Sequence, residues 1–334
     1  METEANHPTK EISASPSSLK ARFAATLLFL IPIIVILLTY PTADERKKSG
    51  GEEVVNIKEP FPEVNILAKS AYILDIENQK VIYAKNEKEP LPLASLAKVM
   101  TALVALEKID SYEKIKITSD SIRQEGDSGL KNEEKWRLKD LIDFSLVTSS
   151  NDGIYAVASA IESVRHSSTA TETAGEQENE PSAESSREKF IDLMNKKAKD
   201  ILLNQTFYLN ETGLDSPDNV SGGYGSAEDM AKLFAYIIKN NPEVLEATAY
   251  DEIKLVSIDE IDHNAKNTNE ITGEIPSLIA SKTGYTDISG GNLIVAFDLG
   301  LMRPIIISVL GSTIEGRFED MKKLIEETVE YLTK

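Results

Sequence analysis

Ser95 and Lys98 lie three residues apart in an apolar stretch, Pro90 to Glu107, and this spacing could build a nucleophile. Proline keeps the residue before it out of helical geometry, so we expect a helix to begin after Pro92. Residues three apart share one face of a helix, which places the Lys98 amine beside the Ser95 hydroxyl. Near the positive end of a helix, such a pair can form an activated serine. A capping serine and a surface lysine would give the same pattern, so other motifs must decide.

Two further polar motifs occur later in the chain, one in a predicted turn and one before predicted strands, where their side chains could reach a site. Ser149-Ser-Asn151 follows an apolar helical pattern and lies in a predicted turn, because a second helical pattern begins at Asp152. Lys282-Thr-Gly284 precedes two segments with strand patterns. Read separately, each motif has a plain structural explanation as a helix cap, a turn or a strand end.

The composition favours lysine over histidine as the base of such a site. The chain has three histidines, of which His7 lies in a polar tail and His166 at the edge of a low-complexity run. A Ser-His-Asp triad would therefore depend on His263 alone, and a His-rich metal site is excluded. The absence of cysteine removes disulfides, cysteine nucleophiles and cysteine-based zinc sites. We therefore expect neither a metal nor a cofactor.

The elements that would position these residues predict an α+β fold. Two β-type runs, 70–76 and 80–84, form a predicted hairpin that leads directly into the Ser95 helix. Two more strand-like runs, 292–298 and 304–310, precede an amphipathic helix at the end of the chain. The apolar residues on one side of this helix are Phe318, Met321, Leu324, Ile325, Val329 and Leu332. This order of elements favours an antiparallel sheet flanked by helices over a doubly wound sheet.

The first sixty residues divide into three predicted segments. Residues 1–22 are polar and typical of a disordered tail. No charged residue occurs from Phe23 to Tyr40, so we expect residues 23–41 to form one transmembrane helix. A cleaved signal peptide is the alternative, but the long leading tail and the lack of a good small-x-small site favour an uncleaved anchor. Residues 42–60 are charged and typical of a linker.

We expect residues 61–334 to form one domain with a low-complexity insertion at 166–187. The insertion contains no aliphatic residue larger than alanine, so it has nothing to bury. The formal net charge of the chain is −19, which argues against a nucleic-acid partner, because neutralising phosphates needs clustered lysine and arginine.

Together, in this order, the three motifs resemble those of the D-alanyl-D-alanine carboxypeptidases, the low-molecular-mass penicillin-binding proteins of peptidase family S11. The segment Leu93-Ala-Ser-Leu-Ala-Lys-Val-Met-Thr-Ala is similar to the nucleophile segment of that family. Ser150-Asn-Asp-Gly resembles its Ser-Gly-Asn-Asp turn, with serine in place of glycine. Asn210-Glu-Thr-Gly-Leu-Asp resembles its Gly-Leu loop, and Lys282-Thr-Gly-Tyr-Thr-Asp its third motif. The resemblance runs from about Pro60 to the C-terminus and is interrupted by the insertion.

The resemblance implies the transpeptidase fold of penicillin-binding proteins and β-lactamases, in which an antiparallel sheet flanked by helices adjoins an all-helical subdomain. The sequence ends after the last predicted helix, without the β-rich C-terminal domain and C-terminal membrane helix of many relatives. We therefore expect the N-terminal span to act as the membrane anchor.

The resemblance also implies a serine-type D-Ala-D-Ala carboxypeptidase that trims peptidoglycan stem peptides through an acyl-enzyme on Ser95. β-Lactam antibiotics would then be covalent inhibitors. Lys98 would take the proton from Ser95, which requires burial and nearby positive charge to lower its pKa. Ser149 would relay a proton to the leaving D-alanine, and Asn151 would orient Lys98 and the substrate amide.

The third motif would bind the substrate. By the resemblance, Lys282 and Thr283 would hold its terminal carboxylate, and the backbone N–H groups of Ser95 and Tyr285 would form an oxyanion hole. Gly284 would let the strand approach closely. Because peptidoglycan lies outside the cell membrane, residues after the span should be extracytoplasmic and the tail cytoplasmic.

Three other functions remain open from the sequence. A D,D-endopeptidase acting on peptidoglycan cross-links would use the same residues. A β-lactamase of class A would have a glutamate for deacylation in a Glu-x-x-Leu-Asn segment, which this sequence lacks. An inactive peptidoglycan-binding scaffold would have no need of Ser95, Lys98 and Lys282 together.

Overall fold

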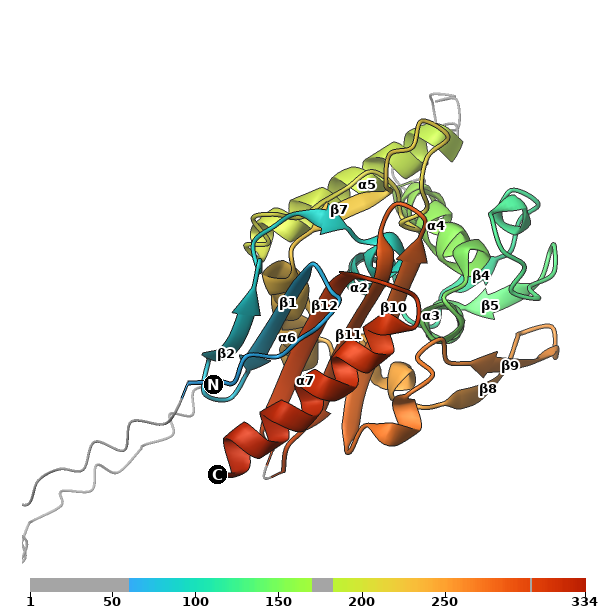
Figure 1. Cartoon of the computed structure of the whole chain (residues 1–334). Helices are drawn as coiled ribbons and strands as arrows, with labels where there is room; N and C mark the ends of the chain where they lie inside the picture. Colours follow the sequence, from blue (N-terminus) through green and yellow to red (C-terminus); the bar gives the residue numbers. More distant parts are fainter. Residues whose placement is uncertain (1–59, 170–182, 301) are drawn as a thin grey trace, which may run out of the picture. The chain divides into compact units, whose positions relative to one another are not determined.

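The computed structural model describes residues 60–169, 183–300 and 302–334 (Figure 1). The predicted tail at 1–22, the predicted anchor at 23–41, nearly all of the linker at 42–60 and the centre of the predicted insertion lie outside the described residues. Across the described part, none of the helices combines the length and the apolar character that crossing a bilayer requires.

A five-stranded antiparallel sheet forms the centre of this domain (Figure 1). Its strands, in spatial order, are β10 (Leu278–Thr286), β11 (Gly290–Asp298), β12 (Pro304–Ser312), β1 (Ser70–Asp75) and β2 (Lys80–Lys85). The predicted hairpin is confirmed as β1 and β2, and the two late strand patterns are confirmed as β11 and β12. The order brings the start and the end of this domain together, because β12 pairs with β1.

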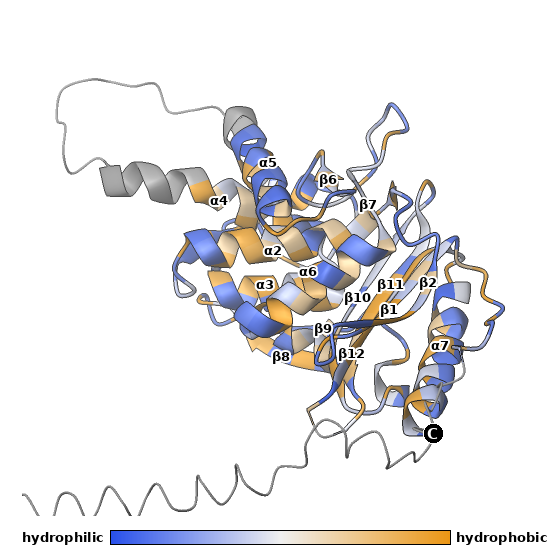
Figure 2. Ribbon diagram, turned by 90° about the vertical axis from the view of Figure 1, so that its left-hand side faces the viewer, coloured by the Kyte–Doolittle hydropathy of each residue, from blue (hydrophilic) through white to orange (hydrophobic). Residues whose placement is uncertain are grey.

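Both faces of the sheet are covered, which explains the nearly continuous apolar runs of β11 and β12. On one face, Leu293, Val295 and Phe297 pack against α7 (Gly316–Thr333), the predicted terminal helix. On the other face, Ile294 and Ala296 belong to the larger core built with the remaining helices. Figure 2 shows α7 on one side of the sheet and α2, α3 and α6 on the other.

The larger core lies among five helices. They are α2 (Ala97–Lys108), α3 (Leu138–Thr148), α4 (Asn151–Thr169), α5 (Ala183–Asp200) and α6 (Ala227–Asn240). The helices α4 and α5 both reach into the predicted insertion at 166–187, so both of its ends are helical. Trp136 is fully buried in this core. The structure therefore confirms a mixed fold with antiparallel sheets flanked by helices.

Short antiparallel strands lie between these longer elements. They are β3 (Leu91–Pro92), β4 (Lys114–Lys116), β5 (Lys135–Arg137), β6 (Phe207–Tyr208), β7 (Gly223–Gly225), β8 (Glu252–Val256) and β9 (Asp262–Lys266). β3 pairs with β7, which fixes the chain immediately before Ser95 against the loop that follows β6.

Candidate active site

Ser95 lies in a single turn of 3-10 helix, η1 (Ala94–Leu96), which continues directly into α2. The predicted helix after Pro92 is thus confirmed. The preceding residue, Ala94, has a φ of +48°, in the left-handed region that a residue with a Cβ seldom adopts. Such strain persists only where the surroundings enforce it, and here it turns the chain sharply before the helix.

Lys98 lies one turn after Ser95, as the spacing predicts, and its amine contacts the serine. Lys98 Nζ donates to Ser95 Oγ at 2.8 Å and to the backbone oxygen of Thr212 at 2.6 Å. The side chain is fully buried, and this burial lowers the pKa of Lys98 to about 7, although the carboxylate of Glu211 opposes the shift. A substantial fraction of Lys98 is therefore neutral near neutral pH, where it can accept a proton.

Ser149 approaches from the end of α3. It caps that helix with a φ of +62°, which ends the helix and starts the turn into α4. Its Oγ accepts a hydrogen bond from Lys282 Nζ at 2.9 Å, and the same amine donates to the backbone oxygen of Thr283 at 2.9 Å. The second and third motifs, 133 residues apart in the sequence, therefore meet in space.

β10 lies directly against η1, and Gly284 makes this contact possible. A Cβ at Gly284 would be 2.8 Å from the backbone oxygen of Leu93 and 3.4 Å from Ala94 Cβ. Asn292 of β11 secures the same junction, since its Nδ2 donates to the backbone oxygens of Pro92 at 3.0 Å and Leu93 at 3.1 Å. The backbone around Tyr285 is thus held beside the turn that carries the serine.

Lys282 is a second buried amine in the site, only 2% exposed. Burial, the charge of Lys98 and the charge of Arg317 together hold its pKa well below the usual value. Arg317, from α7, donates to the backbone oxygen of Gly284 at 3.0 Å. Two lysines and an arginine thus lie where β10 meets the serine, and an anion bound beside Lys282 would favour the charged form of that lysine.

Asn151 contacts different partners from those predicted. Its Nδ2 donates to the backbone oxygen of Glu125 at 2.6 Å, whereas the hydrogen bonds of Lys98 go to Ser95 and Thr212. Asn151 Oδ1 is buried and has no hydrogen-bond partner within the described part of the chain. A bound amide N–H could satisfy this oxygen.

The remaining residues of the third motif face different surroundings. Thr283 Oγ1 lies 2.5 Å from Thr268 Oγ1, so the two hydroxyls are hydrogen bonded. The side chain of Tyr285 is 42% exposed, and its hydroxyl donates to Asp287 at 3.0 Å.

Sequence reasoning missed two groups of this site. The backbone oxygen of Thr212, which accepts from Lys98, lies in the Gly-Leu loop, but a backbone carbonyl has no signature of its own. Arg317 belongs to a helix predicted only as a packing element, and its near-complete burial is visible only in the fold. Among the described residues, no cluster of three or more His, Cys, Asp or Glu side chains could hold a metal ion.

Comparisons with known proteins agree with this geometry. A family model for peptidase S11, described as D-alanyl-D-alanine carboxypeptidase, matches residues 55–166 and 182–313. The D-alanyl-D-alanine carboxypeptidase DacF of Bacillus subtilis is 28% identical over 307 residues, which cover 90% of this chain and 70% of that protein. DacD of Escherichia coli, another D-alanyl-D-alanine carboxypeptidase, is 28% identical over 296 residues, covering 83% of this chain and 67% of that protein.

Solved structures share the fold. Penicillin-binding protein D2 from Listeria monocytogenes, in its ampicillin-bound form, superposes with a TM-score of 0.62 at 25% identity, covering 80% of this chain and 98% of that one. The D-alanyl-D-alanine carboxypeptidase of Mycobacterium tuberculosis gives a TM-score of 0.65 at 22% identity, covering 80% of this chain and 93% of that one. Since the family model matches well over half of the sequence, the chain belongs to peptidase family S11, the D-alanyl-D-alanine carboxypeptidases, which are serine hydrolases.

Proposed function

We propose that this protein removes the terminal D-alanine from peptidoglycan stem peptides through an acyl-enzyme on Ser95. The observation that carries the proposal is the buried Lys98 amine, 2.8 Å from Ser95 Oγ, with its pKa lowered to about 7. A surface lysine would stay protonated near neutral pH and could not act as a base. Membership of the S11 family supports the same reaction.

In the proposed first step, Ser95 Oγ attacks the carbonyl carbon of the penultimate D-alanine, and neutral Lys98 takes the hydroxyl proton. The C–N bond then breaks while the leaving nitrogen receives, through Ser149, the proton that Lys98 had taken. D-Alanine departs and an ester remains on Ser95. Water attacks this ester while Lys98 takes a proton from the water, and that proton passes to Ser95 Oγ as the ester C–O bond breaks and the peptide leaves.

The proposed binding groups lie around the same carbonyl. The N–H groups of Ser95 and Tyr285 would donate to the developing oxyanion, a role supported by the tight contact of β10 with η1 at Gly284. Lys282 and Thr283 would hold the terminal carboxylate. A bound carboxylate would favour the protonated form of Lys282 while Lys98 stays neutral. Asn151 Oδ1, buried without a partner among the described residues, would accept from a substrate amide.

Incubation with a pentapeptide that ends in D-Ala-D-Ala tests this proposal. The wild-type protein should release D-alanine, and the Ser95→Ala variant should release none. Cleavage of the cross-link between two peptidoglycan stem peptides, without release of D-alanine from the pentapeptide, would indicate an endopeptidase instead. Turnover of penicillin without any peptide cleavage would indicate a β-lactamase, and no reaction with either substrate would indicate a binding scaffold.

We also propose that residues 23–41 anchor the enzyme in the cell membrane with the catalytic domain outside. The uncharged run from Phe23 to Tyr40 and the extracellular position of peptidoglycan support this arrangement. Protease added to intact spheroplasts should digest the C-terminal domain and spare an epitope placed before residue 22. Protection of the domain, or its release into the medium, would contradict the anchor.

A further inference from the structure

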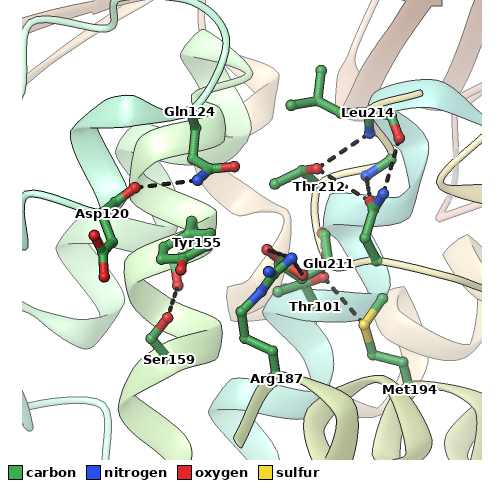
Figure 3. A network of polar contacts seen from close by, with 12 residues as sticks. Thr101, Asp120, Gln124, Tyr155, Ser159, Arg187, Met194, Glu211, Thr212 and Leu214 are labelled. Atoms are coloured by element: carbon green, nitrogen blue, oxygen red, sulfur yellow. Dashed lines mark hydrogen bonds and ion pairs between the residues drawn. The ribbon is translucent and has the colours of Figure 1, made fainter. Parts of the chain in front are cut away.

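A buried ion pair stands beside the loop that contacts Lys98. The carboxylate of Glu211 is 1% exposed, and Arg187 Nη2 donates to its two oxygens at 3.1 and 3.2 Å. Arg187 comes from the first half of α5, and its guanidinium lies 4.9 Å from the centre of the Tyr155 ring of α4. Figure 3 shows Arg187 pointing at Glu211 between these elements. The pair thus ties two helices to one loop.

That loop supplies the backbone partner of the proposed base. Glu211 is followed by Thr212, whose backbone oxygen accepts from Lys98 Nζ at 2.6 Å. The backbone oxygen of Glu211 itself accepts from Thr101 Oγ1 at 2.7 Å. Thr101 lies three residues after Lys98 on α2, so two consecutive carbonyls of the loop bind one face of that helix. A displacement of Glu211 would therefore move the acceptor of Lys98.

The charge of Glu211 also acts on Lys98. It is the carboxylate that raises the pKa of Lys98 against the effect of burial. The other titratable groups coupled to this pair of lysines are basic: Lys282 on β10, whose pKa is lowered by Lys98, and Arg317 on α7, which lowers it further. Since the Glu211 side chain is almost fully buried, Arg187 is the cation that compensates it, and without Arg187 an unpaired carboxylate would remain close to the base.

We propose that Arg187 is a positioning residue of this active site: by pairing with Glu211, it fixes the loop carbonyl that binds Lys98 and offsets the negative charge that would otherwise keep Lys98 protonated. The inference rests on the proposed function, in which neutral Lys98 is the base. It adds a residue at the edge of the insertion to the machinery of acylation, although Arg187 itself need not touch the substrate.

The test is the pH dependence of acylation by a fluorescent penicillin, followed in wild type and three variants of the full chain. The acidic limb of the pH–rate profile is the range in which the acylation rate falls as the pH is lowered. In Arg187→Gln, unpaired Glu211 should hold the proton on Lys98, so this limb should move to higher pH. In Glu211→Gln, the attraction is lost while Arg187 stays positive, so the limb should move to lower pH. Each shift should be about half a pH unit or more. The midpoint of the acidic limb in the double variant should lie between the midpoints of the two single variants.

A matched control separates this effect from loss of stability. Arg303 and Asp75 form a pair of nearly the same burial, with side-chain exposures of 31% and 0%, against 32% and 1% for Arg187 and Glu211. Arg303 immediately precedes β12, roughly 26 Å along the strand from Gly311, which adjoins the site. Arg303→Gln should lower the melting temperature and leave the acidic limb unchanged.

The midpoint of the limb does not depend on how much of the protein is active, so partial misfolding does not hide the result. If Arg187→Gln yields no folded protein, the double variant is compared with Glu211→Gln, and its acidic limb should lie at higher pH because the positive charge of Arg187 is lost. Unchanged limbs, or shifts in the same direction for both single variants, would overturn the proposal. Failure of the wild type to react at Ser95 would instead overturn the proposed function.

Discussion

Two buried lysines would carry the proposed chemistry of this site, and their surroundings differ. Lys98 is enclosed by α2 and the Gly-Leu loop, where it contacts one hydroxyl and one carbonyl. Lys282 lies on a strand, beside Ser149 and within the field of Arg317. Both pKa values are lowered by burial, but only Lys98 also has a carboxylate, Glu211, raising its value. Binding an anion beside Lys282 would stabilise its charge, which leaves Lys98 as the neutral amine.

The rate of acylation should therefore depend on pH in a defined way. Lowering the pH through about 7 protonates Lys98 and removes the base, so the second-order rate constant with penicillin should fall about tenfold per pH unit below that point. Above pH 8 it should be nearly constant. Stopped-flow fluorescence between pH 5.5 and 9.5 measures this curve, with circular dichroism confirming that the protein stays folded. A rate that keeps rising past pH 9 would mean that Lys98 has an ordinary pKa.

Ser149 should be needed for proton transfer and not for the turn that holds it. Its φ of +62° suits glycine, so Ser149→Gly removes the hydroxyl without adding backbone strain. We expect release of D-alanine to slow by about 10²–10⁴-fold, the usual contribution of a proton-transferring group. The control is Ser159→Ala on α4, where the hydroxyl only donates to the backbone oxygen of Tyr155. Equal activity of Ser149→Gly and wild type would remove Ser149 from the mechanism.

At the scale of elements, the site depends on the contact between β10 and η1. Gly284 faces the backbone of Leu93, and Asn292 on the neighbouring strand bonds the same carbonyl. Gly311 N in turn donates to Asn292 Oδ1 at 2.8 Å, so β12 also takes part in holding this junction. Three strands thus determine where the serine turn lies relative to Lys282.

A methyl group at Gly284 should disturb that junction. In Gly284→Ala the new Cβ would be 2.8 Å from the backbone oxygen of Leu93, so β10 or η1 must move. We expect at least a tenfold loss of penicillin acylation and a loss of about 1–3 kcal/mol in the free energy of unfolding. Gly273→Ala is the matched control, because its nearest neighbour would be a side-chain oxygen of Asp251 at 3.6 Å, an ordinary contact. Full activity of Gly284→Ala would show that close approach at this point is unnecessary.

The sequence predicted the elements whose signals are local. The β1–β2 hairpin and α7 follow from periodic apolar residues, and Ser95 and Lys98 meet because their spacing fits a helical turn. Contacts made by the backbone could not be predicted in this way. The Thr212 carbonyl depends on how a loop folds onto α2, and the bond from Asn151 to Glu125 depends on a loop that has no periodic pattern. Tertiary packing decides both.

At the scale of the whole molecule, the start and the end of the domain are fastened together by one carboxylate. Asp320 of α7 is fully buried and accepts from the backbone N–H groups of Leu67 at 2.9 Å and Ala68 at 2.8 Å. It also accepts from Ser312 Oγ at 2.7 Å, at the end of β12. The chain before β1, the last strand and the last helix thus share one hydrogen-bonding centre, on the side of the sheet covered by α7.

Asp320→Ala should therefore destabilise the domain without changing its chemistry. The substitution leaves one buried backbone donor, one partly buried backbone donor and one hydroxyl without their partner, and we expect a loss of about 2–5 kcal/mol in the free energy of unfolding. Urea unfolding at pH 7.5 measures the loss, and acylation at low temperature should remain close to wild type. Glu326→Gln, at an exposed position of the same helix, should change neither quantity. Unchanged stability of Asp320→Ala would show that this carboxylate is not needed to hold the start and the end of the domain together.

The central claim is that Ser95, activated by Lys98, forms a covalent acyl-enzyme. Intact-protein mass spectrometry after incubation with benzylpenicillin, followed by peptide mapping, tests it most directly. The account predicts one added penicilloyl group per chain, located on Ser95 and absent from Ser95→Ala. An adduct on another residue, or an equal adduct on Ser95→Ala, would contradict it.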